Sequence, residues 1–144
     1  MERLQTLPHI HVKADHQVIH LAMTSEERQK VRRRLTASDG LELALELPTG
    51  TTLPVGQVLF ARDDTVYVVA AAPEDILLVR PRSWQEAAQV GHMIGNLHRD
   101  VDIGEDGVAA LWDAPLERKL EQAAFDFTRT SRPFRGKPMG EHSH

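Results

Sequence analysis

The 144-residue chain contains no cysteine. This absence excludes disulfide bonds, thiolate metal ligands and a cysteine nucleophile, and it fits a reducing compartment. Long apolar runs are also lacking, because a run such as Val66–Ala72 is far shorter than the roughly 20 residues that cross a membrane. The N-terminal residues 1–4 do not have the charged-then-apolar order of a secretion signal. We therefore expect a cytoplasmic protein without a membrane partner.

An excess of charge of one sign is lacking as well. The chain has 17 basic and 21 acidic residues, for a formal net charge of -4. This balance gives no reason to expect nucleic acid as a partner, and the basic run 28–34 is predicted to be a solvated face. The sequence also has no HExxH-like pair, Gly-rich phosphate loop or Gly-x-Ser-x-Gly elbow. These absences predict a binding protein and not an enzyme.

The first half of the chain has the pattern of short β-strands. Leucines alternate with Glu or Ala over residues 41–47, and a period of two indicates a strand with one buried face. Thr24-x-x-Glu27 resembles a capping box, but the segment up to Leu35 has few apolar anchors, so we predict a turn followed by a strand. Further strands are predicted at 17–21, 58–60 and 66–69. Regular short strands with turns between them favour a small sandwich or barrel.

The second half changes its period. A buried strand at 76–79 precedes Ser83-x-x-Glu86, a capping box that opens a helix. We predict that Gly95 and Asn96 end this helix, since both tolerate the left-handed conformation. The predicted core stripe of the helix consists of Trp84, Ala87, Ala88, Gly91 and Ile94.

Two short strands, 101–103 and 108–111, then flank the turn 104–107. Asp113 is predicted to cap a second helix, and the segment 125–127 can start a final strand. The order βαββαβ is the ferredoxin-like pattern. The predicted fold class is therefore α+β with two small domains. Their predicted bounds are 1–74 for an all-β domain, 75–131 for a ferredoxin-like domain and 132–144 for a flexible tail that contains histidines.

Several motifs together resemble a known family. They are Asp39-Gly40, Leu47-Pro48-Thr49-Gly50, Gly56-Gln57-Val58-Leu59, Ile94-Gly95-Asn96-Leu97-His98, Arg132-Pro133-Phe134 and the terminal histidines. In this order and spacing, the chain resembles the urease accessory nickel chaperones of the UreE family. The resemblance implies a peptide-binding-like N-terminal domain, and a C-terminal ferredoxin-like domain that binds metal and forms a homodimer. It also implies delivery of Ni²⁺ to apo-urease, together with accessory proteins that include a GTPase.

The chain departs from the family pattern at several positions. Many members have arginine where this chain has Thr49 and Leu97, and some carry extra metal-binding histidines where it reads Leu111-Trp112-Asp113-Ala114. The long histidine run at the end of many members is reduced here to His142 and His144. We therefore do not expect a second metal site in the folded domain or a storage role for the tail.

His98 matches the family's main metal ligand, but one imidazole is too few donors for Ni²⁺. His92 lies six residues upstream, about 120° around a helix, so the two rings do not form a ready chelate. The interpretation is that His98 side chains from two protomers meet at a twofold axis, and that His142 or His144 completes the coordination. The candidate metal ligands are thus His98, His142, His144 and His92. An imidazole site also accepts Zn²⁺ or Cu²⁺.

Two other functional classes compete with this interpretation. A peptide-binding co-chaperone module would use the N-terminal β domain, with metal binding incidental. A metallohydrolase would need about three protein ligands within one chain, and no such clustered set is apparent in the sequence. The preferred prediction is a nickel carrier that binds and transfers its ion without chemical conversion.

Overall fold

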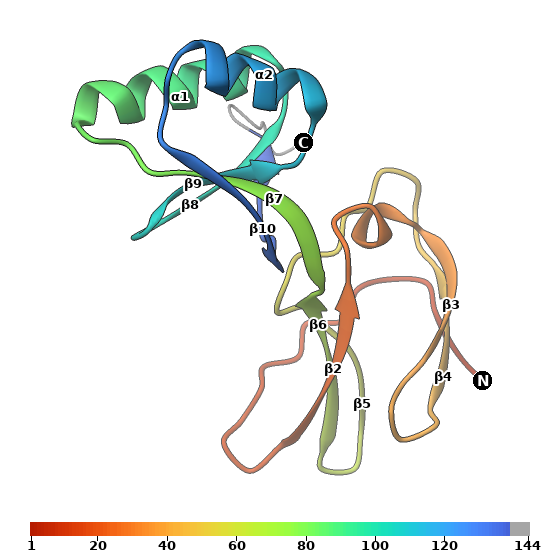
Figure 1. Ribbon diagram of the computed structural model, residues 1–144. Helices are drawn as coiled ribbons and strands as arrows, with labels where there is room; N and C mark the ends of the chain where they lie inside the picture. Colours follow the sequence, from red (N-terminus) through yellow and green to blue (C-terminus); the bar gives the residue numbers. More distant parts are fainter. Residues whose placement is uncertain (139–144) are drawn as a thin grey trace. The chain divides into compact units, whose positions relative to one another are not determined.

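The computed structural model describes residues 1–138, and these form two compact units (Figure 1). The first unit is Met1–Ala71 and the second begins at Ala72. The N-terminal unit is built of short strands and the C-terminal unit contains both α-helices, so the predicted α+β class with two parts is confirmed. No helix among the described residues is long and apolar enough to traverse a lipid bilayer.

The N-terminal unit contains two three-stranded sheets. One sheet has the order β1-β4-β3 and the other has the order β2-β6-β5. The first strand of each sheet pairs in parallel, β1 with β4 and β2 with β6, while the remaining pairs are antiparallel. The strands are β1 (Glu2–Leu4), β2 (Gln17–Met23), β3 (Arg32–Thr36), β4 (Glu42–Glu46), β5 (Val58–Arg62) and β6 (Thr65–Ala71).

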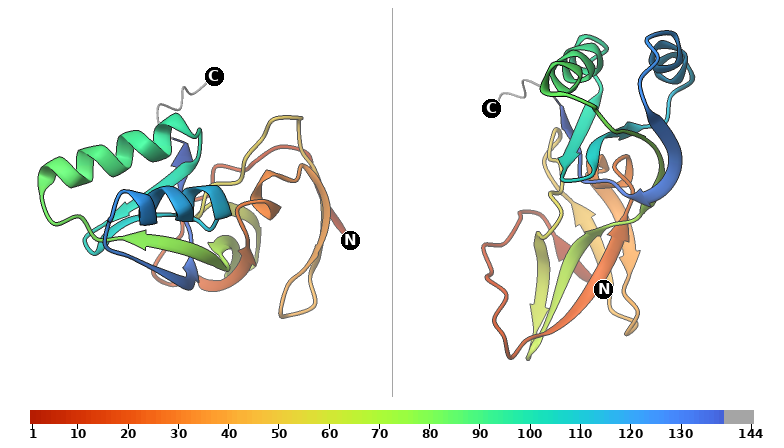
Figure 2. Two further views of the ribbon diagram at one scale, coloured as in Figure 1. Left: turned by 45° about the horizontal axis from the view of Figure 1, so that its top comes forward. Right: turned by 60° about the vertical axis from the view of Figure 1, so that its left-hand side comes forward.

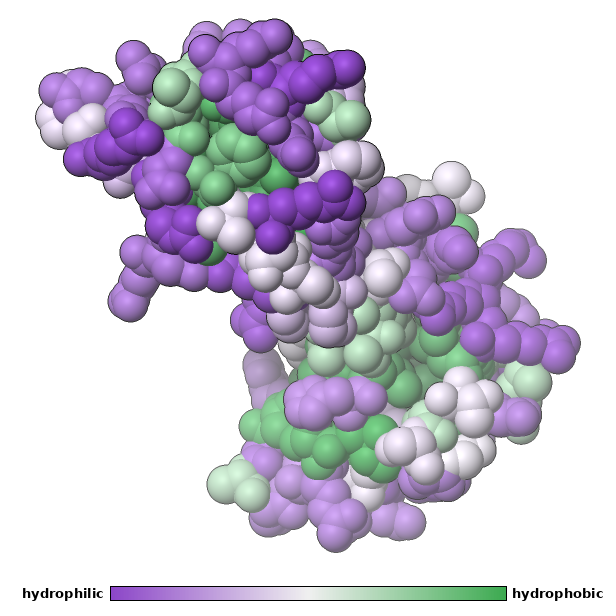
Figure 3. Space-filling model, viewed as in Figure 1, coloured by the Kyte–Doolittle hydropathy of each residue, from purple (hydrophilic) through white to green (hydrophobic). Residues whose placement is uncertain are grey.

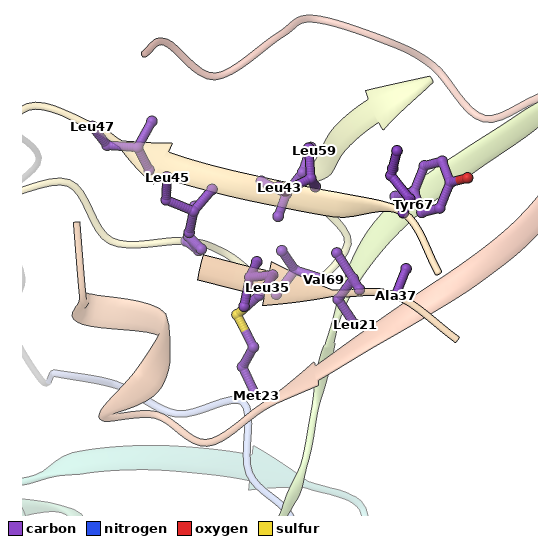
Figure 4. Close-up of a cluster of buried hydrophobic side chains, with 12 residues drawn as sticks. Leu21, Met23, Leu35, Ala37, Leu43, Leu45, Leu47, Leu59, Tyr67 and Val69 are labelled. Carbon is purple, nitrogen blue, oxygen red and sulfur yellow. The ribbon is translucent and has the colours of Figure 1, made fainter. Parts of the chain in front are cut away.

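One hydrophobic cluster joins the inner faces of these two sheets (Figure 4). Leu43 and Leu45 of β4 point into it, and Leu21 of β2 and Tyr67 of β6 meet them from the other sheet. This is the alternation that the sequence shows over residues 41–47, because successive side chains of a strand point to opposite faces. The predicted sandwich-like packing therefore follows from period-two burial.

The segment between β2 and β3 combines a turn with a buried arginine. Thr24 and Glu27 exchange backbone-to-side-chain hydrogen bonds of 2.9 and 3.1 Å, as the capping box predicts. They start the short 3₁₀ helix η1 (Glu27–Gln29), and β3 follows. The prediction that the basic run is a solvated face is wrong at Arg28, which is buried and donates a 2.8 Å hydrogen bond to the Met23 carbonyl. A buried guanidinium requires such acceptors.

The C-terminal unit has the βαββαβ order that the sequence predicts. Its antiparallel sheet has the order β10-β7-β9-β8-β11, which is the ferredoxin-like arrangement with one short strand added at an edge. Helices α1 and α2 lie on the same side of this sheet (Figure 2). The elements are β7 (Pro73–Val79), α1 (Trp84–Asn96), β8 (Asp100–Gly104), β9 (Gly107–Leu111), α2 (Ala114–Gln122), β10 (Phe127–Pro133) and β11 (Lys137–Pro138).

Both helices start where the sequence predicts. Ser83 accepts a hydrogen bond from the Glu86 amide at 3.1 Å, and Asp113 accepts one from the Leu116 amide at 3.2 Å. The core prediction for α1 is wrong at Trp84, whose exposed fraction is 77%, and at Ala88, which is also exposed. The buried residues of α1 are Val90 and Ile94, and Trp84 lies about 120° around the helix from Val90. The buried face of α1 therefore runs through Val90 and Ile94, and the Trp84 indole is exposed to solvent.

The boundaries of the units differ from the predicted ones at both ends of the second unit. The predicted boundary between residues 74 and 75 falls inside β7, which begins at Pro73, two residues after the first unit ends at Ala71. Part of the segment predicted as a flexible tail is structured, because Pro133 belongs to β10 and the Phe134 side chain is fully buried. The visible surface of this unit is mostly hydrophilic, with a hydrophobic patch below the helices (Figure 3).

Candidate metal-binding region

The end of α1 presents His98 in a conformation that is rare for a residue with a side chain. His98 has a φ of 55°, in the left-handed region. Its amide donates to the Gly95 carbonyl at 3.0 Å and the Arg99 amide donates to the Ile94 carbonyl at 3.3 Å. This pair of bonds is a Schellman motif, in which glycine commonly holds the left-handed position. These two backbone hydrogen bonds therefore fix the direction in which the imidazole leaves the helix end.

The helix ends at Asn96, within the predicted Gly95-Asn96 stop. Gly95 and Asn96 were expected to be left-handed, but both are helical and Leu97 is the C-cap. Leu97, the C-cap, packs against the core cluster of this unit and leaves the left-handed position to the next residue. His98 consequently lies directly after the C-cap, two residues beyond Asn96 as predicted.

His98 is exposed to solvent, as a ligand for an incoming ion must be. The residue after it is tied to the second helix, since Arg99 donates to Asp113 Oδ1 at 3.2 Å. The C-terminal end of a helix carries partial negative charge, which favours a nearby cation. The structure therefore presents one accessible imidazole, on a fixed backbone, next to a weakly cation-attracting helix end.

His92 lies on the exposed face of α1, whereas His98 lies beyond the end of this helix. Its Nε2 is 3.3 Å from the Asn96 side-chain amide, one turn further along the helix. Both residues line a groove of about 320 Å³. Its remaining lining residues are Gln89, Met93, Leu97 and Lys119. Sequence reasoning did not single out this groove, although the half-buried pair Met93 and Leu97, four residues apart on α1, is its apolar signal.

One chain does not assemble a metal cage within the region that the structure covers. Residues 1–138 contain no group of three or more His, Asp or Glu side chains placed to hold a metal ion. The other two candidate ligands, His142 and His144, lie outside the described residues. Because Ni²⁺ needs more donors than one imidazole, a site built on His98 must draw its other ligands from beyond this part of one chain.

The chain leaves the described region close to His98. Strand β11 pairs with β8 in antiparallel register, Lys137 opposite Val101 and Pro138 opposite Asp100. Asp100 is only two residues after His98. Pro138, the residue before the last six of the chain, is therefore held against β8, which starts two residues after His98.

The segment 111–114, where some family members carry extra histidines, here takes part in an ion-pair and aromatic network. The Arg129 guanidinium lies 4.1 Å from the centre of the Trp112 ring and also binds Asp75. The Trp112 indole N–H donates to Glu117 at 2.8 Å. The Arg129 hydrogen bonds hold the pKa of Asp75 below its usual value. This network joins β7, β10 and α2, and it offers no imidazole to a metal.

Comparison with known proteins assigns the chain to a family. Residues 1–72 match the model of the "UreE urease accessory protein, N-terminal domain", and residues 74–144 match that of the "UreE urease accessory protein, C-terminal domain". The chain belongs to the UreE family. The resemblance drawn from the sequence motifs is therefore confirmed, and a protein of this family is a urease accessory protein with a part in urease maturation.

Similar proteins of this name occur in distant bacteria. The chain is 51% identical over 128 residues to the urease accessory protein UreE of Synechococcus sp. (strain JA-3-3Ab), covering 89% of this chain and 86% of the relative. It is 50% identical over 126 residues to UreE of Deinococcus radiodurans, covering 86% and 80% of the two chains. A more distant relative, UreE of Geobacillus kaustophilus, is 30% identical over 131 residues and covers 90% and 84%.

Proposed function

We propose that this UreE-family protein is a metallochaperone that binds Ni²⁺ and delivers it to apo-urease. The metal would be held between two copies of the chain, with one His98 from each. The observation that carries the proposal is the exposed imidazole of His98, fixed on a left-handed backbone at the end of α1. A neutral imidazole is a good Ni²⁺ ligand, and its exposure allows both loading and release.

Sharing between two copies accounts for the missing donors. If a twofold axis lies near His98, each ligand close to the axis is present once in each chain. Each chain then needs to supply only half of the metal ligands. Half-buried Met93 and Leu97, in the groove that also includes His92, offer apolar surface on α1 to a second copy. His92 is the weaker ligand candidate, because its ring already contacts Asn96.

The tail supplies the remaining candidates. His142 is four residues beyond Pro138, a distance of at most about 14 Å for an extended chain. Since Pro138 pairs with Asp100, the tail starts within reach of the helix end that carries His98. We infer that His142 or His144 completes the coordination. Zn²⁺ or Cu²⁺ would occupy the same ligands, because imidazole selects weakly among these ions.

The proposed activity is transfer by ligand exchange, without a chemical reaction of the protein. Docking of apo-urease, with accessory proteins that include a GTPase, would present better-placed ligands and take the ion. An incomplete and exposed site suits this role, because a closed cage with all its ligands would release its metal slowly.

Calorimetric titration with Ni²⁺, combined with mass measurement, tests the proposal. The wild-type protein should bind one Ni²⁺ per two chains in its tight phase. His98→Gly should remove that phase, and glycine is the suitable replacement because it adopts the left-handed conformation without strain. His11→Gly is the matched control, since it removes another exposed imidazole from an irregular segment and should leave the titration unchanged.

Two results would contradict the proposal. Unchanged Ni²⁺ affinity and stoichiometry in His98→Gly would reject His98 as the ligand. One tight Ni²⁺ per isolated monomer would reject the shared site, whichever residues bind. A truncation after Pro138 separates the tail's contribution, and it should weaken binding while leaving the two-chain stoichiometry in place.

A further inference from the structure

The C-terminal sheet has a second hydrophobic face, on the side away from the helices. On β7, Leu77 and Val79 pack with the buried residues of both helices. Ile76 and Leu78 instead belong to a separate cluster, together with Ala109 of β9. Because successive side chains of a strand point to opposite faces, this separate cluster lies on the face opposite α1 and α2 (Figure 2). Its burial therefore requires a cover other than the helices.

Phe134 contributes to that cover from outside the sheet. It follows β10 directly, and its side chain is fully buried in the cluster with Ile76, Leu78 and Ala109. An aromatic ring removes more apolar surface from water than most side chains do. The ring therefore anchors the segment that follows β10 to the outer face of the sheet.

Gly136 has no room for a side chain because the Phe134 ring lies against it. A Cβ built at Gly136 would overlap Cζ and Cε2 of that ring. The ring is held in a packed cluster, so it cannot move aside without leaving its place. The ring of Phe134 and the bare backbone of Gly136 together set the path of the chain over the sheet.

The anchored segment leads from one edge of the sheet to the other. β10 lies at one edge and β11 at the other, and only three residues separate these strands in the sequence. On the β8 side, the Arg135 amide donates to Asp102 Oδ2 at 3.2 Å, and Lys137 pairs with Val101. Residues 134–138 therefore form a strap that starts under the middle of the sheet and ends as an added edge strand.

The strap holds the part of β8 that is nearest to His98. β8 pairs with β9 through Asp102–Gly104, and it pairs with β11 through Asp100 and Val101. Asp100 is two residues after His98. The pairing with β11 therefore extends the support of β8 by two residues towards the candidate metal ligand.

From these contacts we propose that Phe134 is a positioning residue for the metal site. It holds β11 against the start of β8, and this pairing steadies the backbone from which the His98 imidazole extends. A ligand must be held close to its productive geometry by supporting residues, and loss of such support typically lowers metal affinity about 10–100-fold. The inference rests on the proposed function, because that function makes His98 a ligand.

Amide hydrogen exchange of the metal-free, full-length protein tests the anchor itself. Phe134→Ala and Gly136→Ala should each speed exchange at residues 100, 101 and 137 by at least about tenfold, because local opening of β11 becomes easier. Phe134→Leu keeps an apolar side chain and should restore slow exchange. Unchanged exchange within α1 shows that the unit remains folded.

Gly104→Ala is the matched control for Gly136→Ala. It adds the same methyl group at the other end of β8, where the new Cβ would make an ordinary contact of 3.4 Å with Asp106 Oδ1. Exchange at residues 100, 101 and 137 should therefore stay as in the wild type.

Calorimetric titration with Ni²⁺ tests the consequence for the metal site. Phe134→Ala should weaken the tight phase by at least about tenfold, while Phe134→Leu and Gly104→Ala should bind as the wild type does. The loss should persist in a chain that ends at Pro138, because the strap acts on β8 and not only on the tail.

Several results would overturn this inference and leave the proposed function standing. They are unchanged exchange in Phe134→Ala, faster exchange with unchanged Ni²⁺ affinity, an equal effect of Gly104→Ala, or a loss confined to the full-length chain. Failure of the proposed function is recognised separately, by an unchanged titration in His98→Gly, and that result would remove the inference as well.

Discussion

Arg99 and Asp113 join the residue after His98 to the N-cap of α2. The guanidinium donates to Oδ1 at 3.2 Å, while Oδ2 of the same carboxylate caps α2 through the Leu116 amide. One side chain thus stabilises the end of one helix and the start of the next. The segment that carries His98 is held by this carboxylate as well as by its own turn.

Replacement of Asp113 should separate these two contributions. Asp113→Asn keeps an acceptor for the cap and weakens an ion pair that is partly exposed, so it should cost less than about 1 kcal/mol. Asp113→Ala also removes the cap and should cost about 1–2 kcal/mol. Urea denaturation measures both. Equal losses in the two variants would show that the cap contributes nothing.

Two left-handed residues should respond to glycine in the same way. Ala124, with a φ of 58°, ends α2 as His98 ends α1, since its amide and that of Phe125 bond back to Glu121 and Leu120. Ala124→Gly should therefore raise the free energy of unfolding by about 1 kcal/mol, because glycine pays no Cβ penalty there. His98→Gly should likewise exceed His98→Ala in stability, measured by thermal or urea unfolding. A destabilised Ala124→Gly would contradict the assigned conformation.

Gly107 in the β8–β9 hairpin should not tolerate any side chain. Its φ is 144°, and a Cβ at this position would overlap the carbonyl oxygen of Val79 on the neighbouring strand. Gly107→Ala should destabilise the protein by about 3 kcal/mol or more, because backbone must move to relieve the overlap. Gly91→Ala is the control, since Gly91 lies in α1 with open space around it and alanine should stabilise the helix by roughly 0.5–1 kcal/mol. Soluble expression and urea midpoints distinguish the two.

The buried Tyr67 should make the stability of the N-terminal unit depend on acid pH. Its hydroxyl donates to Asp39 Oδ2 at 2.5 Å, and this bond, with one from the Leu41 amide, lowers the pKa of Asp39. A lowered pKa in the folded state adds stability above the unfolded value of about 3.9, and that stability is lost as the pH falls through the folded pKa. Tyr67→Phe should therefore be less stable than wild type at pH 7, and the difference should shrink below about pH 4. A constant difference in urea unfolding from pH 7 to 3 would contradict the charged hydrogen bond.

The sequence predicts best those features that depend on local pattern. The capping residues Ser83 and Asp113, the Thr24–Glu27 box and the alternating leucines of β4 all take the predicted conformation. These signals involve side chains within a few residues of one another, so the rest of the fold has little influence on them. The βαββαβ order follows from joining such local signals in sequence.

Features that depend on distant packing were not predictable in the same way. The helix α1 ends at the predicted Gly-Asn pair, but the left-handed conformation falls on His98, after Leu97 has packed against the core. The parallel pairing of β2 with β6 joins strands more than forty residues apart, and no local motif encodes it. The accessible position of His98 was predictable from its motif, whereas its left-handed backbone required the actual position of the helix end.

The pairing of β11 with β8 limits how far the last residues can travel from His98. Covalent geometry keeps His142 within about 14 Å of Pro138, and a ligand tethered at so short a distance acts at an effective concentration in the millimolar range. Under the proposed function, an ion that leaves one imidazole would be recaptured by a neighbouring one before it diffuses away. Escape to bulk solvent would then be rare, and departure of the nickel would await a recipient able to compete at that local concentration.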